Sequence, residues 1–353
     1  MARCARSRLV RPVPRRTHTQ ELAALGIHRI PVPIPFPQAG GPVNVYLVED
    51  ADGGLLMVDA GYGSDEATAA LAAGLDAAGR RFEDVRRIVV THGHVDHFGG
   101  VRFVQERAGR EVPVLAHPAD IPKMAEGGPR WREVAPLYGA HLTRLGVPVE
   151  VLLAIAGEGE RGFRARRIPE VRPLAAGTRI RTRHLDLEVL HMPGHTPGLV
   201  CLFDRSRGLL FSNDHLLERI SPNPLMELGP DGQDGFFRPL LAYLESAART
   251  RALDVERVLP GHGPPFGDHR TVLDGLAVFY RKRQERLLEL LDVPRTPYEL
   301  AGHLFRTLRP GDTFLVLSEV MANLEVLEAD GAVVRDEAEV RRYSRSSATL
   351  TVS

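Results

Sequence analysis

The chain reads Val89-Val90-Thr91-His92-Gly93-His94-Val95-Asp96-His97-Phe98-Gly99-Gly100 where an apolar run gives way to a histidine-rich turn. Three imidazoles and one carboxylate fall within six positions of this stretch, from His92 to His97. Neutral imidazole and carboxylate groups bind borderline cations such as zinc, and the His-x-His spacing lets both rings leave a strand end on the same side. The stretch therefore predicts a metal site at the end of a buried strand.

Three later loops carry further metal-binding side chains, each after a strand-like apolar run. His195 lies in the segment 192–198, where proline and glycine bracket the ring and indicate a sharp turn. Asp214 follows the run 208–211, and His262 follows the run 255–259. The candidate ligands are His92, His94, Asp96, His97, His195, Asp214 and His262. This set is too large for one tetrahedral ion and fits two ions that share one ligand.

The chain resembles the metallo-β-lactamase fold superfamily in these loops, above all in its Thr-His-x-His-x-Asp-His signature at residues 91–97. The resemblance implies an α/β fold, a four-layer αβ/βα sandwich over residues 22–271 with the metals at one edge. It also implies a ligand set for each ion and a bridge: His92, His94 and His195 on the first ion, Asp96, His97 and His262 on the second, and Asp214 between them.

The same resemblance gives roles to two more carboxylates. Asp59 follows the apolar run 55–58 and is expected to hydrogen-bond the metal loop and orient its ligands. Asp96 is the expected catalytic residue, because its carboxylate would orient an attacking hydroxide by accepting its proton. Two divalent cations, zinc first with manganese or iron as alternatives, would supply that hydroxide near neutral pH and stabilise the developing oxyanion. Hydrolysis is therefore the expected class of reaction.

Short apolar runs alternate with stretches of helical period, which favours the same fold independently of the resemblance. The runs that read as strands are 45–48, 55–58, 88–90, 112–115, 187–190, 199–203 and 209–211. Helical periods cover 66–78 and 101–108, and the segment 204–208 reads as a hairpin turn. Such alternation predicts a sheet covered by helices.

Composition sets the outer limits. A chain of 353 residues with 43% apolar side chains can hold one large domain and a small appendage. The formal net charge is zero, so no global field selects a nucleic acid or a membrane surface. Residues 1–21 form an arginine-rich segment without a secretory apolar region, and we expect a disordered tail. No apolar run is long enough to span a bilayer, so a cytoplasmic protein without membrane partners is expected.

An insertion at about residues 118–173 separates two of the predicted strands. Insertions of this length commonly form a lid beside the site, and a homodimer contact is the alternative role. Trp131 and Tyr138, in a helical stretch of this insertion, are expected to face the substrate. Asn223 lies between two prolines and is a further candidate for a substrate contact, with a plain turn role as the alternative.

The C-terminal part, residues 272–345, reads as long helix, short helix, amphipathic helix and hairpin, followed by a tail at 346–353. This order resembles the small winged-helix module of a subgroup that includes endoribonucleases similar to β-lactamase-like protein 2. Its amphipathic helix carries Glu319, Glu325 and Glu328, which fits packing or dimerisation better than phosphate contacts.

Three functions are compatible with these residues. The first is hydrolysis of a small-molecule ester or thioester, as in hydrolases similar to glyoxalase II, and the alternative is metal-dependent endoribonuclease activity. A lesser alternative is an iron-dependent redox member of the superfamily. Asp214 argues against antibiotic hydrolysis, because true β-lactamases lack this bridging carboxylate. The zero net charge does not favour a nucleic acid as the partner.

Overall fold

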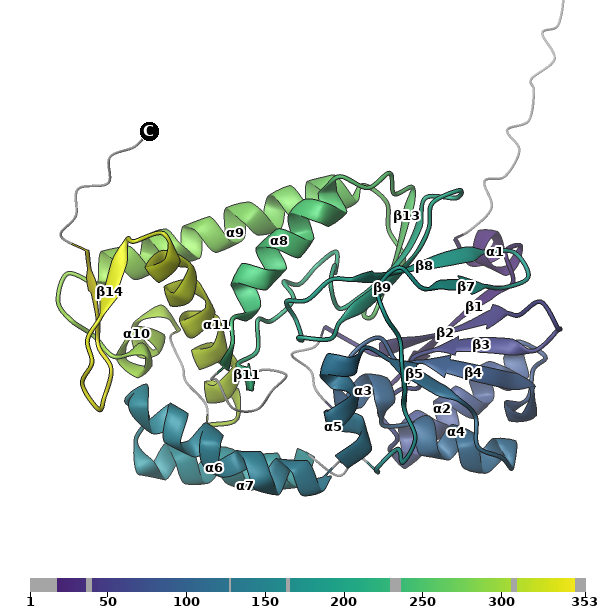
Figure 1. Ribbon diagram of the computed structural model, residues 1–353, viewed down its shortest axis with the longest axis horizontal. Coiled ribbons are helices and arrows are strands. Elements are labelled where there is room, and N and C mark those ends of the chain that lie inside the picture. The colour runs from purple at the N-terminus through teal and green to yellow at the C-terminus, as the bar shows by residue number, and fades with distance from the viewer. Residues whose placement is uncertain are drawn as a thin grey trace, which may run out of the picture.

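The computed structural model describes residues 18–35, 40–126, 128–162, 166–228, 236–305 and 310–346. Two sheets face each other in the right half of the molecule as drawn in Figure 1. The first sheet has the order β1 (Ile27–Val32), β2 (Val43–Glu49), β3 (Leu55–Val58), β4 (Val85–Val89), β5 (Val114–Ala116) and β6 (Arg172–Pro173). The second has the order β13 (Arg257–Pro260), β10 (Leu209–Asn213), β9 (Val200–Asp204), β8 (Asp186–His191) and β7 (Arg179–Arg181).

Helices cover the outer face of each sheet, and the two inner faces pack on each other (Figure 1). Strand β2 shows how the sequence achieves this, because alternate side chains point to opposite faces. Val45 and Leu47 pack with α2 (Asp65–Ala77) and α4 (Val101–Ala108). Tyr46 points the other way and meets Phe211 of the second sheet edge to face, with ring centroids 5.4 Å apart. The four-layer αβ/βα sandwich is confirmed.

The outer face of the second sheet carries α8 (Pro239–Arg251) and α9 (His269–Leu290). Helix α9 continues beyond the sandwich. Leu273 near its start packs with Val258 and Phe266 of the second sheet's side, whereas Leu287 near its end joins a separate hydrophobic cluster. The predicted boundary at residue 272 therefore falls within one continuous helix that belongs to both parts.

The predicted N-terminal tail is wrong in its extent. Helix α1 (His18–Ala23) begins inside the segment 1–21 that was expected to be a disordered tail. Leu22 is buried between the two sheets, and Glu21 forms an ion pair with Arg257 of β13 at 2.9 Å. Leu22 and the Glu21–Arg257 ion pair attach this short helix to the sandwich, contacts that an arginine-rich segment does not suggest. Residues 1–17 lie outside the described residues.

The insertion and the C-terminal part form one helical body beside the sandwich (Figure 1). The insertion contributes α6 (Gly128–Arg144) and α7 (Val149–Gly162), whereas its first elements, η3 (Pro118–Asp120) and α5 (Ile121–Glu126), lie against the sandwich, where Met124 is buried in the core. The C-terminal part contributes α10 (Pro297–Leu304), α11 (Pro310–Ala329), β14 (Val333–Arg335) and β15 (Tyr343–Arg345). Leu145, Leu300 and Leu317 share its core. The winged-helix resemblance of this part stays a prediction. No helix of the described residues is long and apolar enough to cross a membrane.

Glu325 of α11 is a partly buried carboxylate in this helical body, and its charged form lowers the stability of the fold. Its Oε2 atom is buried and has no hydrogen-bond partner among the described residues. Burial raises the pKa of Glu325 from 4.5 to about 7, although the nearby Arg238 guanidinium opposes the rise. The folded chain thus holds this proton more tightly than the unfolded chain does. The contribution of Glu325 to the stability of the fold is therefore highest below about pH 4.5 and is lost as the pH rises through about 7.

Glu325→Gln is expected to raise the free energy of unfolding near pH 8 by about 2 kcal/mol and to change it little near pH 4. The neutral amide removes the cost of the buried charge, which wild type has only at the higher pH. Denaturant unfolding of both proteins at the two pH values measures the difference, with the exposed Glu337→Gln as the control. An equal gain at both pH values contradicts this explanation.

Candidate metal centre

The candidate ligands follow the carboxyl ends of strands, in loops or, for Asp96 and His97, on the short helix α3 (Val95–Phe98). In the first sheet β3 and β4 are parallel, and they are followed by Asp59 and by the loop 91–97. In the second sheet β8 and β10 run in the same direction because both are antiparallel to β9, and β13 is parallel to β10. His195, Asp214 and His262 follow these strands. The topology thus brings loops that are distant in sequence to one edge of the sandwich.

Hydrogen bonds between the sheets fix these loops relative to one another. The backbone amide of Asn44 in β2 donates to the Gly261 carbonyl at 2.7 Å, next to His262. The Tyr46 hydroxyl donates to the Pro260 carbonyl at 2.8 Å. The Val200 amide of β9 donates to the Thr91 carbonyl at 2.9 Å. Gly261 must be glycine here, because an added Cβ would lie 2.0 Å from Asp214 Oδ1.

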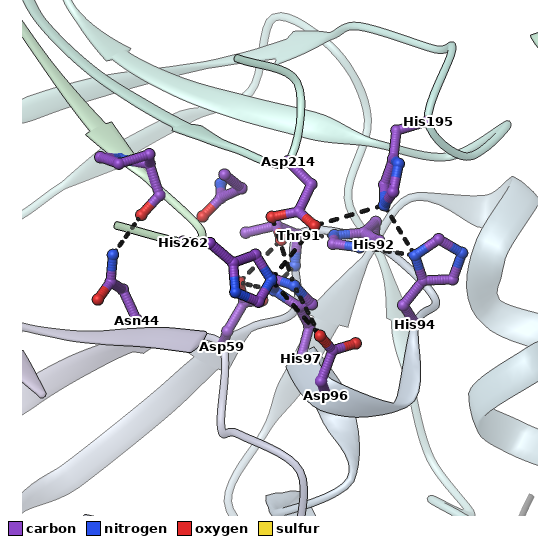
Figure 2. Close-up of polar contacts among 12 residues, drawn as sticks. Asn44, Asp59, Thr91, His92, His94, Asp96, His97, His195, Asp214 and His262 are labelled. Atoms are coloured by element: carbon purple, nitrogen blue, oxygen red, sulfur yellow. Dashed lines mark hydrogen bonds and ion pairs between the residues drawn. The ribbon is translucent and has the colours of Figure 1, made fainter. Parts of the chain in front are cut away.

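Figure 2 shows the side chains of these loops pointing toward one another. His94 Nδ1 lies 3.1 Å from His92 Nε2 and 2.9 Å from His195 Nε2, so these three rings converge. A second group joins Asp96 with two further imidazoles: Asp96 Oδ2 lies 3.9 Å from His97 Nε2 and 3.5 Å from His262 Nε2. Each group offers three ligand atoms close enough to hold one ion.

Asp214 lies between the two groups. Its Oδ2 atom is 3.4 Å from His195 Nε2 of the first group and 3.5 Å from His262 Nε2 of the second. Its Oδ1 atom is 3.5 Å from His97 Nε2. One carboxylate thus faces ligands of both groups, which is the position of a bridge between two cations.

In each candidate ligand ring, one nitrogen faces the other ligands (the inner nitrogen) and the other faces away from them (the outer nitrogen). The hydrogen-bond partners of the two nitrogens differ in a way that fits metal binding. Each outer nitrogen has a partner: Thr91 Oγ1 for His92, Glu227 for His94, Asp59 for His97, the Asn223 carbonyl for His195 and the Gly41 carbonyl for His262. Among the described residues, the inner nitrogens of His97 and His262 are buried without a hydrogen-bond partner, as is Asp214 Oδ1. Metal-binding histidines carry such outer partners, and buried polar atoms without partners are rare unless a ligand satisfies them.

Asp59 holds the metal-binding loop in place through hydrogen bonds. Its carboxylate lies 2.7 Å from His97 Nδ1 and accepts hydrogen bonds from the Thr91 amide at 2.8 Å and the Thr91 hydroxyl at 2.9 Å. The residue is fully buried and adopts a left-handed backbone with φ of 60°. A non-glycine residue in this conformation is strained by about 1 kcal/mol or more, which the three hydrogen bonds offset.

The pKa values of the imidazoles shift in opposite directions in the two halves of the cluster. Burial opposes the charge of His262, but the carboxylates of Asp214 and Asp96 outweigh it and raise its pKa to about 10. Burial and the neighbouring His94 lower the pKa of His195 to about 4. Without a cation, the half beside the carboxylates therefore holds protons. Cations that bind there must displace those protons, so metal affinity weakens as the pH falls.

Asp120, a buried residue of η3 that ties two ligand loops together, was not among the residues predicted from the sequence. Its Oδ2 atom accepts hydrogen bonds from the Gly93 amide at 2.9 Å and the Thr196 hydroxyl at 2.6 Å. Asp120 has no ligand spacing of its own. The usable signal was its place just after β5, because loops at the carboxyl ends of parallel strands surround the site in folds of this kind. Lys123 and Glu227, which contact Asp120 and His94, were not predicted either.

The candidate substrate contacts lie in different surroundings. Asn223 meets the site through its backbone carbonyl, which lies 3.0 Å from His195 Nδ1, while its side-chain Oδ1 is buried without a partner among the described residues. Tyr138 packs edge to face on Phe314 of α11, with ring centroids 5.8 Å apart. The side chain of Trp131 lies outside the described residues.

The αβ/βα sandwich with a His/Asp cluster at its edge defines a metallo-hydrolase class of protein. Residues 39–262 match the family model described as the metallo-beta-lactamase superfamily. The chain belongs to this superfamily, which the resemblance of its motifs predicted.

Several relatives cover most of both chains. The probable metallo-hydrolase YqjP of Bacillus subtilis is 32% identical over 310 residues, which are 86% of this chain and 93% of the relative. The acyl-coenzyme A thioesterase MBLAC2 of Gallus gallus is 32% identical over 67% of this chain and 77% of its own length. Among solved structures, the metallo-beta-lactamase family protein TTHA1429 of Thermus thermophilus superposes with a TM-score of 0.75 at 32% identity, covering 91% of this chain and 98% of that one.

Proposed function

We propose that the protein is a binuclear metal-dependent hydrolase that cleaves an ester or thioester of a small molecule. The observation that carries the proposal is the arrangement of two converging ligand groups with Asp214 between them. His92, His94 and His195 would hold one cation, and Asp96, His97 and His262 the other, with zinc as the expected metal. When bound, such a pair of cations supplies a nucleophilic hydroxide near neutral pH and stabilises negative charge on a carbonyl oxygen.

The protein's own residues then have distinct tasks. Asp96 stands at the N-terminal turn of the short helix α3 (Val95–Phe98) with its carboxylate toward His97 and His262. There it can orient the attacking group by accepting its proton. Asp59 holds His97, and Asp120 holds the loops of His94 and His195, so that the ligands keep their places during turnover. Fixed positions matter because misplaced catalytic groups lose much of their effect.

A thioester is supported as the substrate by the relatives named acyl-coenzyme A thioesterase. Charge argues against the ribonuclease alternative. The chain has a formal net charge of zero, whereas nucleic-acid binding draws on clustered basic side chains. Of the insertion's arginines, Arg166 forms an ion pair with Glu106 and Arg167 donates to the Ala125 carbonyl. These two side chains are thus engaged within the protein.

A parallel assay tests the proposed substrate class. We expect zinc- or manganese-dependent hydrolysis of acyl-coenzyme A thioesters or aryl esters, and no cleavage of labelled single-stranded RNA under the same conditions. The Asp96→Ala variant serves as the control for contaminating activities. Metal-dependent RNA cleavage that is absent from this variant, without any thioesterase or esterase activity, would reverse the assignment in favour of an endoribonuclease.

A further inference from the structure

Lys123 of α5 stands out in a chain whose basic side chains are otherwise arginines, apart from Lys282. Its ammonium group donates to the Glu227 carboxylate and lies 3.4 Å from Asp120 Oδ1. Its stem crosses the backbone between His92 and His94, where an added Cβ on Gly93 would lie 2.7 Å from Lys123 Cδ. The side chain therefore packs directly on the ligand loop.

Glu227 connects this lysine to a candidate ligand. Its Oε1 atom lies 3.0 Å from the outer nitrogen of His94, Nε2, while the inner nitrogen Nδ1 faces His92 and His195. A carboxylate in this position accepts the hydrogen bond of Nε2–H and leaves the lone pair of Nδ1 free for a cation. Glu227 is buried, so its charge needs a partner, and Lys123 provides one on the other carboxylate oxygen.

The helical body holds Glu227 in place. The residue belongs to β11 (Glu227–Leu228), which pairs with β12 (Phe236–Phe237). The Met226 amide donates to Ser318 Oγ of α11 at 3.1 Å, and the Met226 side chain is buried in the core of the helical body. His94 is therefore attached to the insertion through Lys123 and to the C-terminal helices through the strand that carries Glu227.

We propose that Glu227 and Lys123 are positioning residues of the first metal site and that the helical body acts on its affinity through the strand that carries Glu227. This inference rests on the proposed binuclear site and not on the proposed substrate. Glu227 selects the tautomer and orientation of His94, and Lys123 selects the position of Glu227. We expect arginine to be a poor replacement for Lys123, because a planar guanidinium fork differs in size and shape from the compact ammonium that lies between Glu227 and Asp120.

The test is a titration of the metal-free full chain with cobalt(II), followed by its visible absorption and by competition with a chelator. Glu227→Ala is expected to weaken one of two binding steps by roughly 10- to 100-fold and to change the absorption of that site only. Glu227→Gln should keep most of the affinity, because the amide oxygen still accepts the hydrogen bond. Lys123→Met and Lys123→Arg should both weaken the same step, by roughly tenfold.

Two variants serve as matched controls. Glu319→Gln removes the charge of a carboxylate that pairs with Arg283 at 2.6 Å in the same helical body, without contact to a ligand. Lys282→Met removes the other lysine. Both should bind cobalt as wild type does. Wild-type affinity and spectrum in Glu227→Ala overturn the inference. If Glu227→Ala does not fold, wild-type binding in folded Lys123→Met overturns it instead. Absence of metal binding by wild type itself overturns the proposed function.

Discussion

Asp214→Ala is expected to lower the bound metal from roughly two ions per chain toward roughly one and to reduce turnover by about a thousandfold or more. The carboxylate faces His195 of one group and His97 and His262 of the other. Its negative charge is what would let two like-charged cations share so small a space. Metal analysis of the purified variant, together with initial rates on a thioester, measures both effects.

Asp204→Ala is the matched control for this variant. Asp204 is a buried carboxylate at the end of the neighbouring strand β9, and it accepts hydrogen bonds from the Asp186 and Arg207 amides without touching a candidate ligand. Its loss should lower stability and leave the metal content per folded chain unchanged. An Asp214→Ala protein that keeps the full metal content and full activity would refute the bridging role.

Asp96→Ala is expected to reduce turnover by about a thousandfold or more, while the fold stays intact. The residue lies on a short helix at the site edge, and its carboxylate pairs with the candidate ligands His97 and His262, so we expect its removal to cost the structure little. The three rings of the first group keep their positions, so one ion should remain bound. Rates, metal content and thermal unfolding are compared with those of wild type.

Asp96→Asn separates two contributions of this carboxylate. The amide keeps an oxygen that can bind a cation weakly but cannot accept a proton. The variant should therefore retain more metal than Asp96→Ala and still lose most of its turnover. Near-wild-type turnover in Asp96→Asn would show that Asp96 does not accept the proton of the attacking group.

The local spacing of the ligand loops was enough to select the residues that the structure brings together. His92, His94, Asp96 and His97 are close in sequence, and the later three loops each show a histidine or aspartate after a strand, with glycine or proline beside His195 and His262. Strand ends and turn residues are local features, so a single sequence displays them. The four layers were predicted from the resemblance, and strand alternation supported them.

Asp120, Lys123 and Glu227 could not be selected in this way. Asp120 and Lys123 reach the ligand loops only through the tertiary packing of the segment after β5, and Lys123 meets Glu227 across more than a hundred residues of sequence. The sequence shows that α6 and α11 each have an apolar face, but periodicity does not say which faces pack together. The insertion and the C-terminal part were therefore described as two separate segments, whereas Leu142 and Leu324 share one core.

The binuclear assignment depends on how much metal the protein carries. The ratio of metal to protein can be measured by inductively coupled plasma mass spectrometry on the full chain, purified without added metal. Two candidate ligand groups with a carboxylate between them predict two zinc ions per chain. A preparation of folded, active protein with one metal ion per chain or with no metal would contradict the assignment, whereas two iron ions in place of zinc would favour the redox alternative over hydrolysis.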